Sequence, residues 1–219
     1  MRIGILGGTF NPIHIAHLRS AEEVLAAQQL DRVLFIPSAT PPHKPAGGLV
    51  PARHRLAMVK LAIAGNRRFA VSTIETDRGG RSYSVDTLRA LRTRMPHARF
   101  FFILGLDAFR EIGTWKDFRN LFLLCDLVVT SRPPFTQPPT RTLLPVAVRA
   151  EFCYRPKQKI LEHHKGNRII FQSVSALDIS ATSIRALRSR DQSIRYLVPE
   201  LVERYIKRHR LYAGRVASR

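Results

Sequence analysis

Short, continuously apolar runs alternate with helical patterns along this 219-residue chain, and this alternation constrains the fold most. Four such runs occupy Arg2–Leu6, Arg32–Ile36, Arg99–Leu104 and Asp126–Thr130. Strands that lack a polar alternation are typical of parallel sheets covered by helices on both faces. The sequence therefore predicts an α/β fold built on a doubly wound parallel sheet.

The remaining segments complete this expectation. Further strands are expected at Phe69–Thr73 and Arg168–Val174. Helices are expected over Ile15–Gln29, Pro51–Ala64 and Ser84–Met95, the last capped by Ser84. Two more are expected to begin at Ser180 and Pro199. The proline-rich segments Pro37–Val50 and Arg132–Pro145 are expected to be loops. We expect one domain over residues 1–219, with a core of about 1–175 and a helical C-terminal extension of about 176–219.

The charge balance is strongly basic. The chain has 36 Lys and Arg residues against 16 Asp and Glu, a formal net charge of +20. Residues 141–219 carry 17 of the basic and 6 of the acidic residues. Such a field attracts nucleotides, pyrophosphate, nucleic acids and acidic membranes alike, so charge alone does not choose among them.

The sequence also predicts where the protein resides. No apolar stretch approaches the roughly 20 residues that a membrane helix needs. The first residues, Met1–Leu6, are too short and too soon followed by glycine for a signal peptide. A cytoplasmic protein with no membrane partner is therefore expected.

The first chemical motif follows the first strand, where residues 7–17 read GGTFNPIHIAH. Gly7 and Gly8 allow a tight turn and a close approach of the backbone to a ligand. The helix that follows offers unpaired amide groups to an anion. His14 and His17 are three positions apart and are expected on one face of its first turn. The arrangement suits phosphate oxygens, although it is neither a Walker loop nor a dinucleotide fingerprint.

The second motif is ISATSIR at residues 179–185. Ser180 can cap the helix, which leaves Thr182, Ser183 and the first-turn amides near a phosphate. Arg185 adds a permanent charge with a fork of donors that matches phosphate oxygens. Alone, this pattern is more typical of a capped helix with a solvated arginine.

Together the two motifs resemble the G-x-F-x-P-x-H-x-x-H and I-S-[SA]-T-x-[IV]-R signatures of the nucleotidyltransferase α/β-phosphodiesterase superfamily. The most similar family is the bacterial nicotinate-mononucleotide adenylyltransferases. That family usually has Asp in place of Asn11 and Gly in place of Ala16, and neither change removes a histidine. The resemblance implies a Rossmann-like nucleotidyltransferase fold and spans nearly the whole chain.

Four weaker segments extend the resemblance. Lys44 lies in PPHKP, whose basic residue meets nucleotide phosphates in the family. Ser84 and Thr87 lie in SYSVDTL, which resembles the family's segment for the pyridine nucleotide. Gly105 and Asp107 match a G-x-D motif whose aspartate meets ribose hydroxyls, although a helix cap is an equal explanation of that side chain. Trp115 matches a tryptophan that stacks on nicotinate, a role that suits the flat face of an indole.

The resemblance implies adenylyl transfer from ATP to nicotinate mononucleotide, which gives nicotinate adenine dinucleotide and pyrophosphate in NAD biosynthesis. The acceptor phosphate is already an anion, so positioning and charge stabilisation suffice and no nucleophile–base pair is expected. Phosphate-binding residues are expected to include the turn residues Gly7, Gly8, Thr9 and Phe10. His14, His17, Lys44 and Arg185 are expected to carry catalysis, with His17 nearest the α-phosphate. Mg²⁺ is expected to bridge phosphate oxygens with few or no protein ligands.

Other functions stay open on sequence alone. Pantetheine-phosphate adenylyltransferases share both phosphate motifs, but they are typically shorter and lack the segments around Ser84, Asp107 and Trp115. Nicotinamide mononucleotide is a second acceptor to consider. A basic nucleic-acid-binding protein is the non-enzymatic alternative, but the scattered charges and the lack of an RNP or zinc pattern argue against a specific nucleic-acid partner. A phosphate-binding scaffold without activity is a further one, and a homo-oligomer is compatible with the sequence.

Overall fold

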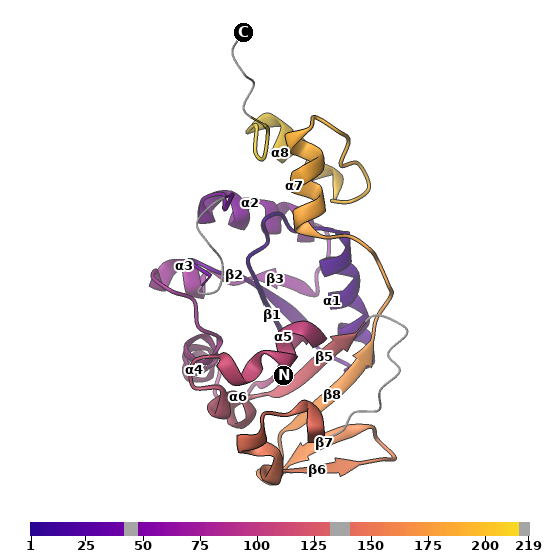
Figure 1. The fold of residues 1–219 in the computed structure, drawn as a ribbon. Coiled ribbons are helices and arrows are strands. Elements are labelled where there is room, and N and C mark those ends of the chain that lie inside the picture. The colour runs from indigo at the N-terminus through magenta and orange to yellow at the C-terminus, as the bar shows by residue number, and fades with distance from the viewer. Residues whose placement is uncertain (42–47, 132–140, 215–219) are drawn as a thin grey trace.

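The computed structural model describes residues 1–41, 48–131 and 141–214 (Figure 1). Its strands are β1 (Arg2–Gly8), β2 (Arg32–Pro37), β3 (Phe69–Val71), β4 (Arg99–Gly105), β5 (Asp126–Ser131), β6 (Phe152–Arg155), β7 (Ile160–His163) and β8 (Arg168–Ser173). Its α-helices are α1 (Ile15–Ala27), α2 (Ala52–Ile63), α3 (Ile74–Arg78), α4 (Ser84–Arg94), α5 (Leu106–Arg110), α6 (Phe118–Leu124), α7 (Ala181–Ser189) and α8 (Glu200–Arg208). Short 3-10 helices lie at Ile112–Thr114, Arg141–Leu143 and Val146–Glu151.

The described strands form one sheet in the order β3-β2-β1-β4-β5-β8-β7-β6. The six strands from β3 to β8 in this order pair in parallel, which confirms the predicted α/β sheet. Two strands that the sequence did not predict, β6 and β7, add an antiparallel edge to this sheet. In β6, the buried Phe152 and half-buried Tyr154 alternate with exposed Cys153 and Arg155. A search for continuous apolar runs misses such an alternating strand.

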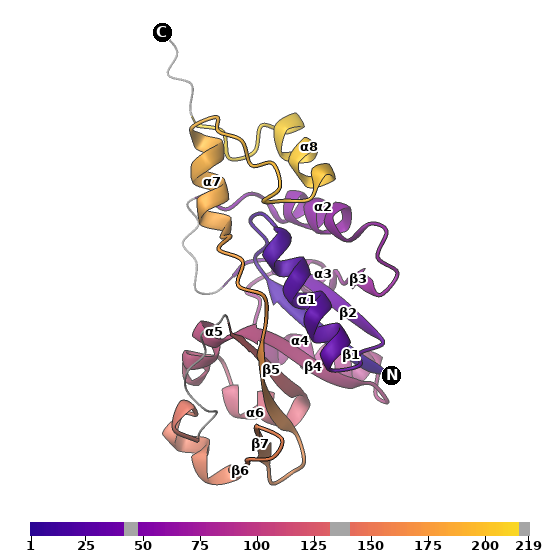
Figure 2. The same ribbon diagram turned by 90° about the vertical axis from the view of Figure 1, so that its right-hand side faces the viewer.

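Both faces of the sheet are covered by apolar clusters. Adjacent residues of a strand point to opposite faces, so each strand contributes to both clusters. On β4, Phe100 and Phe102 pack with residues of α4 and α6, whereas Phe101 and Ile103 pack with residues of α1 and α2. Figure 2 shows α1 in front of the strands with α2 and α8 above it. This double cover explains the unbroken apolar runs of the sequence.

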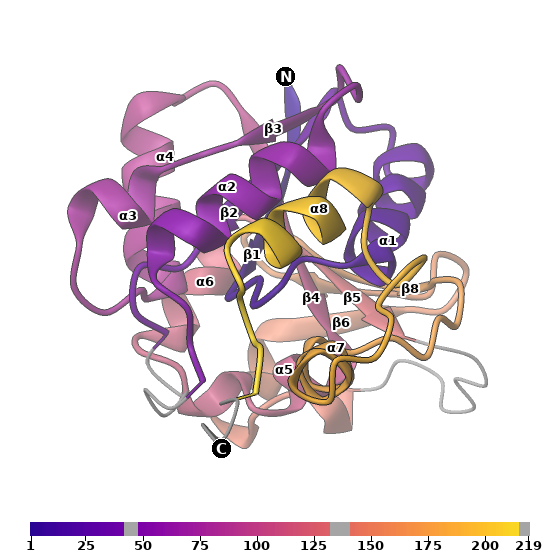
Figure 3. The same cartoon turned by 90° about the horizontal axis from the view of Figure 1, so that it is seen from above.

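The C-terminal extension is packed into the main core. Val202 and Ile206 of α8 are fully buried in the same apolar cluster as Val24 and Leu25 of α1. Helices α2 and α8 lie side by side (Figure 3), and His54 Nδ1 lies 2.9 Å from the Tyr205 hydroxyl. Among the described helices, none is long and apolar enough to cross a membrane.

Gly4, at the centre of β1, allows the side chains of the segment after α1 and of the neighbouring strands to pack closely against β1. A Cβ atom on Gly4 would lie 2.8 Å from Leu30 Cδ1 and within 3.2 Å of Val33 and Ile103 side-chain atoms. By contrast, a Cβ on Gly7 would meet only Phe102, at 4.0 Å. We therefore predict that Gly4→Ala lowers the free energy of unfolding by about 1–3 kcal/mol through overpacking. Urea unfolding measures this, with Gly7→Ala as the matched control, and equal losses in both variants would contradict the packing explanation.

Candidate active site

The strand order changes direction between β1 and β4, and ligands of open α/β sheets bind where the carboxyl ends of such strands diverge. A cleft of about 830 Å³ lies at this place. Its walls come from the start of α1, the ends of β4 and β5, helix α5 and the segment that leads into α7. The residues of the predicted site that line it are His14, His17, Gly105, Asp107, Ser180 and Thr182.

The turn between β1 and α1 has the tight geometry that its glycines predicted. A Cβ on Gly8 would lie 3.0–3.3 Å from the ring atoms of Phe10, so a side chain there would crowd the turn. Phe10 itself adopts a left-handed φ of 48° and is only 3% exposed. Gly7, Gly8, Thr9 and Phe10 are not among the residues that line the cleft. They shape the turn from which the histidines project.

The two histidines lie together, as predicted. Their ring centroids are 3.7 Å apart, and His14 is the N-cap residue of α1. The His14 backbone N–H donates to Nδ1 of His17 at 3.2 Å. Since Nδ1 accepts this bond, the neutral His17 ring carries its proton on Nε2. His17 can therefore present an N–H donor to an anion in the cleft.

The second motif begins α7. Ser180 is the N-cap, and its hydroxyl accepts the Ser183 backbone N–H at 3.0 Å, as predicted. The Ser180 backbone N–H donates to the Ser183 hydroxyl at 3.3 Å, so both serines are engaged in a capping box. Thr182 and the first turn of α7 face the cleft. The helix terminus thus presents its amides, with Thr182 as the exposed hydroxyl.

Arg185 joins the two motifs. Its Nη1 donates to the Asn11 carbonyl at 2.9 Å, and its Nη2 donates to the Thr182 hydroxyl at 3.2 Å. Segments 174 positions apart in sequence therefore meet at one side chain. The predicted Lys44 lies outside the described residues.

The G-x-D motif lies on the rim of the cleft. Gly105 is the N-cap of α5, so the alternative explanation of Asp107 as the cap was wrong. The Asp107 side chain is fully exposed, and its carboxylate lies 3.9 Å from Nη1 of Arg110. Arg110 also lines the cleft and was missed by sequence reasoning, although it follows the motif by one helical turn.

Of the residues predicted to bind the nicotinate nucleotide, Ser84, Thr87 and Trp115 are not among those that line the cleft. Ser84 is the first residue of α4, and Tyr83 is its N-cap, so the expectation that Ser84 caps this helix was wrong. Thr87 is 2% exposed, and its hydroxyl donates to Glu75 Oε1 at 2.7 Å. Burial raises the pKa of Glu75, and the bond from Thr87 opposes that shift. The hydroxyl of Thr87 is therefore engaged inside the protein.

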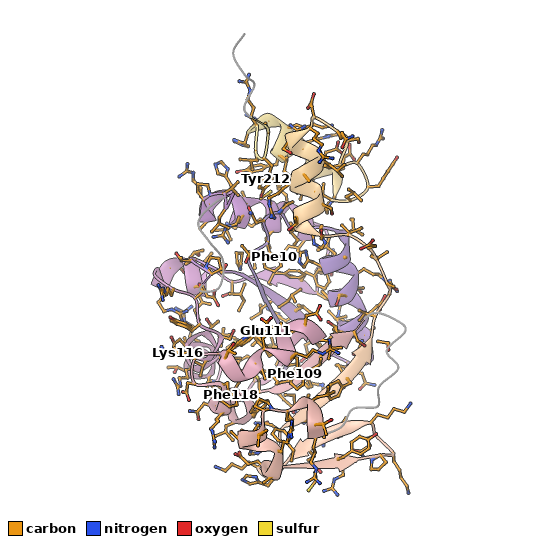
Figure 4. All side chains as sticks on the ribbon, in the orientation of Figure 1. Phe10, Phe109, Glu111, Lys116, Phe118 and Tyr212 are labelled. Atoms are coloured by element: carbon orange, nitrogen blue, oxygen red, sulfur yellow. The ribbon has the colours of Figure 1, made fainter. Side chains whose placement is uncertain are left out.

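Trp115 lies beside the start of α4. Its ring meets Phe102 edge-on, with centroids 6.3 Å apart, and the residue is half-buried. Lys116 joins this segment to α4, since its Nζ lies 2.8 Å from Asp86 Oδ2 and 4.8 Å from the centre of the Tyr83 ring (Figure 4). The neighbour of Trp115 in sequence thus contacts the start of α4, and neither Trp115 nor Ser84 lines the cleft of the two histidines.

A buried arginine that the sequence did not single out supports the turn. Arg55 of α2 is 1% exposed. It donates to the carbonyls of Thr9 at 2.9 Å, Ala39 at 2.8 Å and Val50 at 3.1 Å. It thereby ties together the segments that follow β1 and β2. In the sequence it looks like one more basic residue of a surface helix, and only its contacts reveal its place.

One group of described side chains at the β6–β7 edge, outside the residues that line the cleft, has the composition of a metal site: Glu151, His163 and His164. Nδ1 of the buried His163 accepts the Lys165 backbone N–H at 3.1 Å. The Nε2 atom, 3.0 Å from Glu151 Oε2, then carries the proton and has no lone pair for a metal. The group fits a buried hydrogen-bonded pair better than a metal centre.

Comparisons with known proteins agree with this geometry. The cytidylyltransferase-like family model matches residues 5–187. A probable nicotinate-nucleotide adenylyltransferase of Geobacter sulfurreducens is 54% identical over 213 residues, covering 97% of this chain and 99% of that protein. A protein of the same description from Syntrophotalea carbinolica is 51% identical over 218 residues and covers 100% of both chains.

Solved structures share the fold. The nicotinic acid mononucleotide adenylyltransferase of Plasmodium falciparum, complexed with NaAD, superposes with a TM-score of 0.71 at 18% identity and covers 96% of this chain and 97% of its own. A putative nicotinate-nucleotide adenylyltransferase of Vibrio parahaemolyticus superposes with a TM-score of 0.64 at 15% identity and covers 96% and 94%. Given the identity to relatives over the full chain, the protein belongs to the nicotinate-nucleotide adenylyltransferases of the cytidylyltransferase-like family.

Proposed function

We propose that this protein transfers the adenylyl group of ATP to the phosphate of nicotinate mononucleotide. A phosphate oxygen of the mononucleotide attacks the α-phosphorus, the bond from that phosphorus to the bridging oxygen of the β-phosphate breaks, and pyrophosphate leaves. Nicotinate adenine dinucleotide is the product, an intermediate of NAD biosynthesis. The relatives named for this reaction match the chain over nearly its whole length.

The observation that carries the proposal is the meeting of the two phosphate motifs. Arg185 of α7 donates to the carbonyl of Asn11, which precedes His14 by three residues. The rings of His14 and His17 lie against each other. Cationic and N–H groups from two distant segments therefore converge beside one cleft. Such preorganised donors stabilise the charge that develops during phosphoryl transfer.

The histidines act on the phosphates of ATP in this proposal. His17 donates from Nε2 to the α-phosphate, since its Nδ1 already accepts the His14 backbone N–H. His14 lies against it from the buried side at 6% exposure. The amides of Gly8, Thr9 and Phe10 shape the turn behind them.

We assign the β- and γ-phosphates to the start of α7 and to two basic side chains, Arg185 and Lys44. The first-turn amides following Ser180 point toward the cleft, as helix N-termini do toward anions. Thr182 supplies a hydroxyl, Ser183 holds the helix start through its bonds to Ser180, and Arg185 and Lys44 supply positive charge. Mg²⁺ enters with ATP and neutralises phosphate charge. Asp107 is the sole carboxylate among the described lining residues, so the phosphates rather than the protein would hold the ion.

Nicotinate mononucleotide is assigned to the wall formed by the Ser84 segment and Trp115. Lys116 bridges these two segments, which places the tryptophan within one structural unit with the start of α4. We assign the ring to Trp115, the carboxylate to backbone donors near Ser84 and the ribose to Gly105 and Asp107. Thr87 then supports this wall from inside through Glu75.

We further propose that residues 1–219 act as one nucleotidyltransferase domain in the cytoplasm, with small molecules as its substrates. The shared core of α1 and α8 supports the single domain. Specific nucleic-acid binding is not part of the proposal, since the two phosphate motifs account for a local anion site.

The choice of acceptor tests the proposed reaction. We predict rapid pyrophosphate release from Mg²⁺–ATP with nicotinate mononucleotide, and little release with nicotinamide mononucleotide or phosphopantetheine. A coupled pyrophosphate assay measures all three under the same conditions. Turnover with another acceptor alone would overturn the assignment of Ser84 and Trp115, and a folded, ATP-binding protein with no turnover would overturn the reaction itself.

The assignment of His17 predicts a loss in the chemical step. Removing one preorganised donor from a developing charge lowers kcat by roughly 100-fold to 1,000-fold, and we expect this of His17→Ala. His97→Ala is the matched control, because His97 is exposed in the turn after α4. Steady-state kinetics gives both values, and a kcat within about threefold of wild type would show that the role is wrong.

Trp115 should affect one substrate only. We predict that Trp115→Leu raises the KM for nicotinate mononucleotide roughly threefold to tenfold, the value of one aromatic stacking contact. The KM for ATP should stay within about twofold of wild type, since the phosphate site is elsewhere. Trp115→Phe keeps a stacking face and should restore most of the loss. Equal changes in both KM values would point to a general packing defect instead.

A further inference from the structure

Asn11 lies at a junction of three segments that are distant in sequence. Its side-chain Nδ2 donates to the Gly48 carbonyl at 2.9 Å, and its Oδ1 accepts the Val50 backbone N–H at 3.3 Å. The same Oδ1 accepts the Tyr212 hydroxyl at 2.9 Å. Its backbone carbonyl accepts Nη1 of Arg185 at 2.9 Å. Asn11 is 7% exposed, so these are buried bonds that are costly to leave unmade.

The chemistry of an amide suits this junction. An amide both donates and accepts, and Asn11 does both at once, toward Gly48 and toward Val50 and Tyr212. A carboxylate could accept from Val50 and Tyr212 but could not donate to the Gly48 carbonyl. The set of partners around Asn11 therefore fits an asparagine.

Tyr212 reaches this junction from the end of the described chain. Figure 4 shows it at the base of the C-terminal helices, above Phe10. Burial raises the pKa of its hydroxyl, which therefore stays protonated and available as a donor. Leu211 beside it is buried in the core shared with α1 and α8, and a Cβ on Gly214 would lie 2.4 Å from the Ser189 carbonyl of α7. The segment is held closely against the extension on both sides of Tyr212.

We infer that Asn11 is a positioning residue, through which the Tyr212 segment holds the phosphate-binding turn and Arg185 in register. The Tyr212 hydroxyl and the Val50 amide orient the Asn11 side chain. The position of that side chain sets the backbone carbonyl that receives the Arg185 guanidinium. This inference rests on the proposed function, because it assigns Arg185 to the phosphates of ATP.

The mildest test removes one hydroxyl. We expect Tyr212→Phe to raise the KM for Mg²⁺–ATP, and its Kd by titration calorimetry, roughly threefold to tenfold, in keeping with one neutral hydrogen bond. The KM for nicotinate mononucleotide and kcat should stay within about twofold of wild type. In an Asn11→Ala background, adding Tyr212→Phe should raise the KM and the Kd for Mg²⁺–ATP no further, because the two residues act as one unit.

Tyr205→Phe is the matched control. The Tyr205 hydroxyl also links the C-terminal extension to the rest of the chain, through His54 Nδ1 at 2.9 Å, but it does not reach Asn11. Both variants should lower the thermal midpoint by similar amounts. Only Tyr212→Phe should weaken ATP binding, which a purely structural role would not produce.

Two results would overturn the inference. One is an unchanged ATP Kd in Tyr212→Phe, and the other is an equal weakening in Tyr205→Phe. Calorimetry measures the Kd for Mg²⁺–ATP directly, so it tests the inference even if the protein shows no turnover. Suppose that the wild-type protein binds ATP but forms no dinucleotide, and that Tyr212→Phe weakens ATP binding. This outcome would refute the proposed reaction and still support the role of Asn11.

Discussion

The parallel pairing of β1 with β2 on one side and β4 on the other is the constraint on which the rest of the structure depends. Connections leave the carboxyl ends of β1 and β4 in opposite directions, so a cleft opens between them. This pairing requires a glycine at the centre of β1, because Leu30, Val33 and Ile103 side chains occupy the space of a Cβ on Gly4. The architecture of the site is therefore a consequence of the strand order and of close packing.

The turn at the end of β1 is then held by two arginines from different helices. Arg55 bonds the Thr9 carbonyl from behind, and Arg185 bonds the Asn11 carbonyl from the C-terminal extension. A buried guanidinium costs free energy unless its donors are satisfied, and the backbone carbonyls around Arg55 provide that satisfaction. Both side chains fix the path of the turn while their charges raise the local positive potential.

The C-terminal extension also packs against the turn that begins the candidate site. Val202 and Ile206 bury α8 in the core with α1, and Tyr212 reaches Asn11 at the turn. The extension lies within residues 141–219, the part of the chain with the larger excess of basic residues. Arg185 is one of these basic residues with a defined contact toward the phosphate motif, and several others, such as Arg204 and Lys207, form ion pairs within α8.

The sequence by itself determined the parallel α/β core and both phosphate motifs, because continuous apolar runs, glycine turns and helix caps are local signals. His14, His17 and Ser180 lie where their spacing predicted. Only the tertiary structure decided the antiparallel β6–β7 edge, the burial of Arg55 and the junction at Asn11. Arg55 and Asn11 bond residues that are 46 and 201 positions away, and a buried arginine or asparagine has the same sequence signature as a solvated one. The β6–β7 edge is local, but the alternating residues of β6 lack the continuous apolar run that marks the parallel strands.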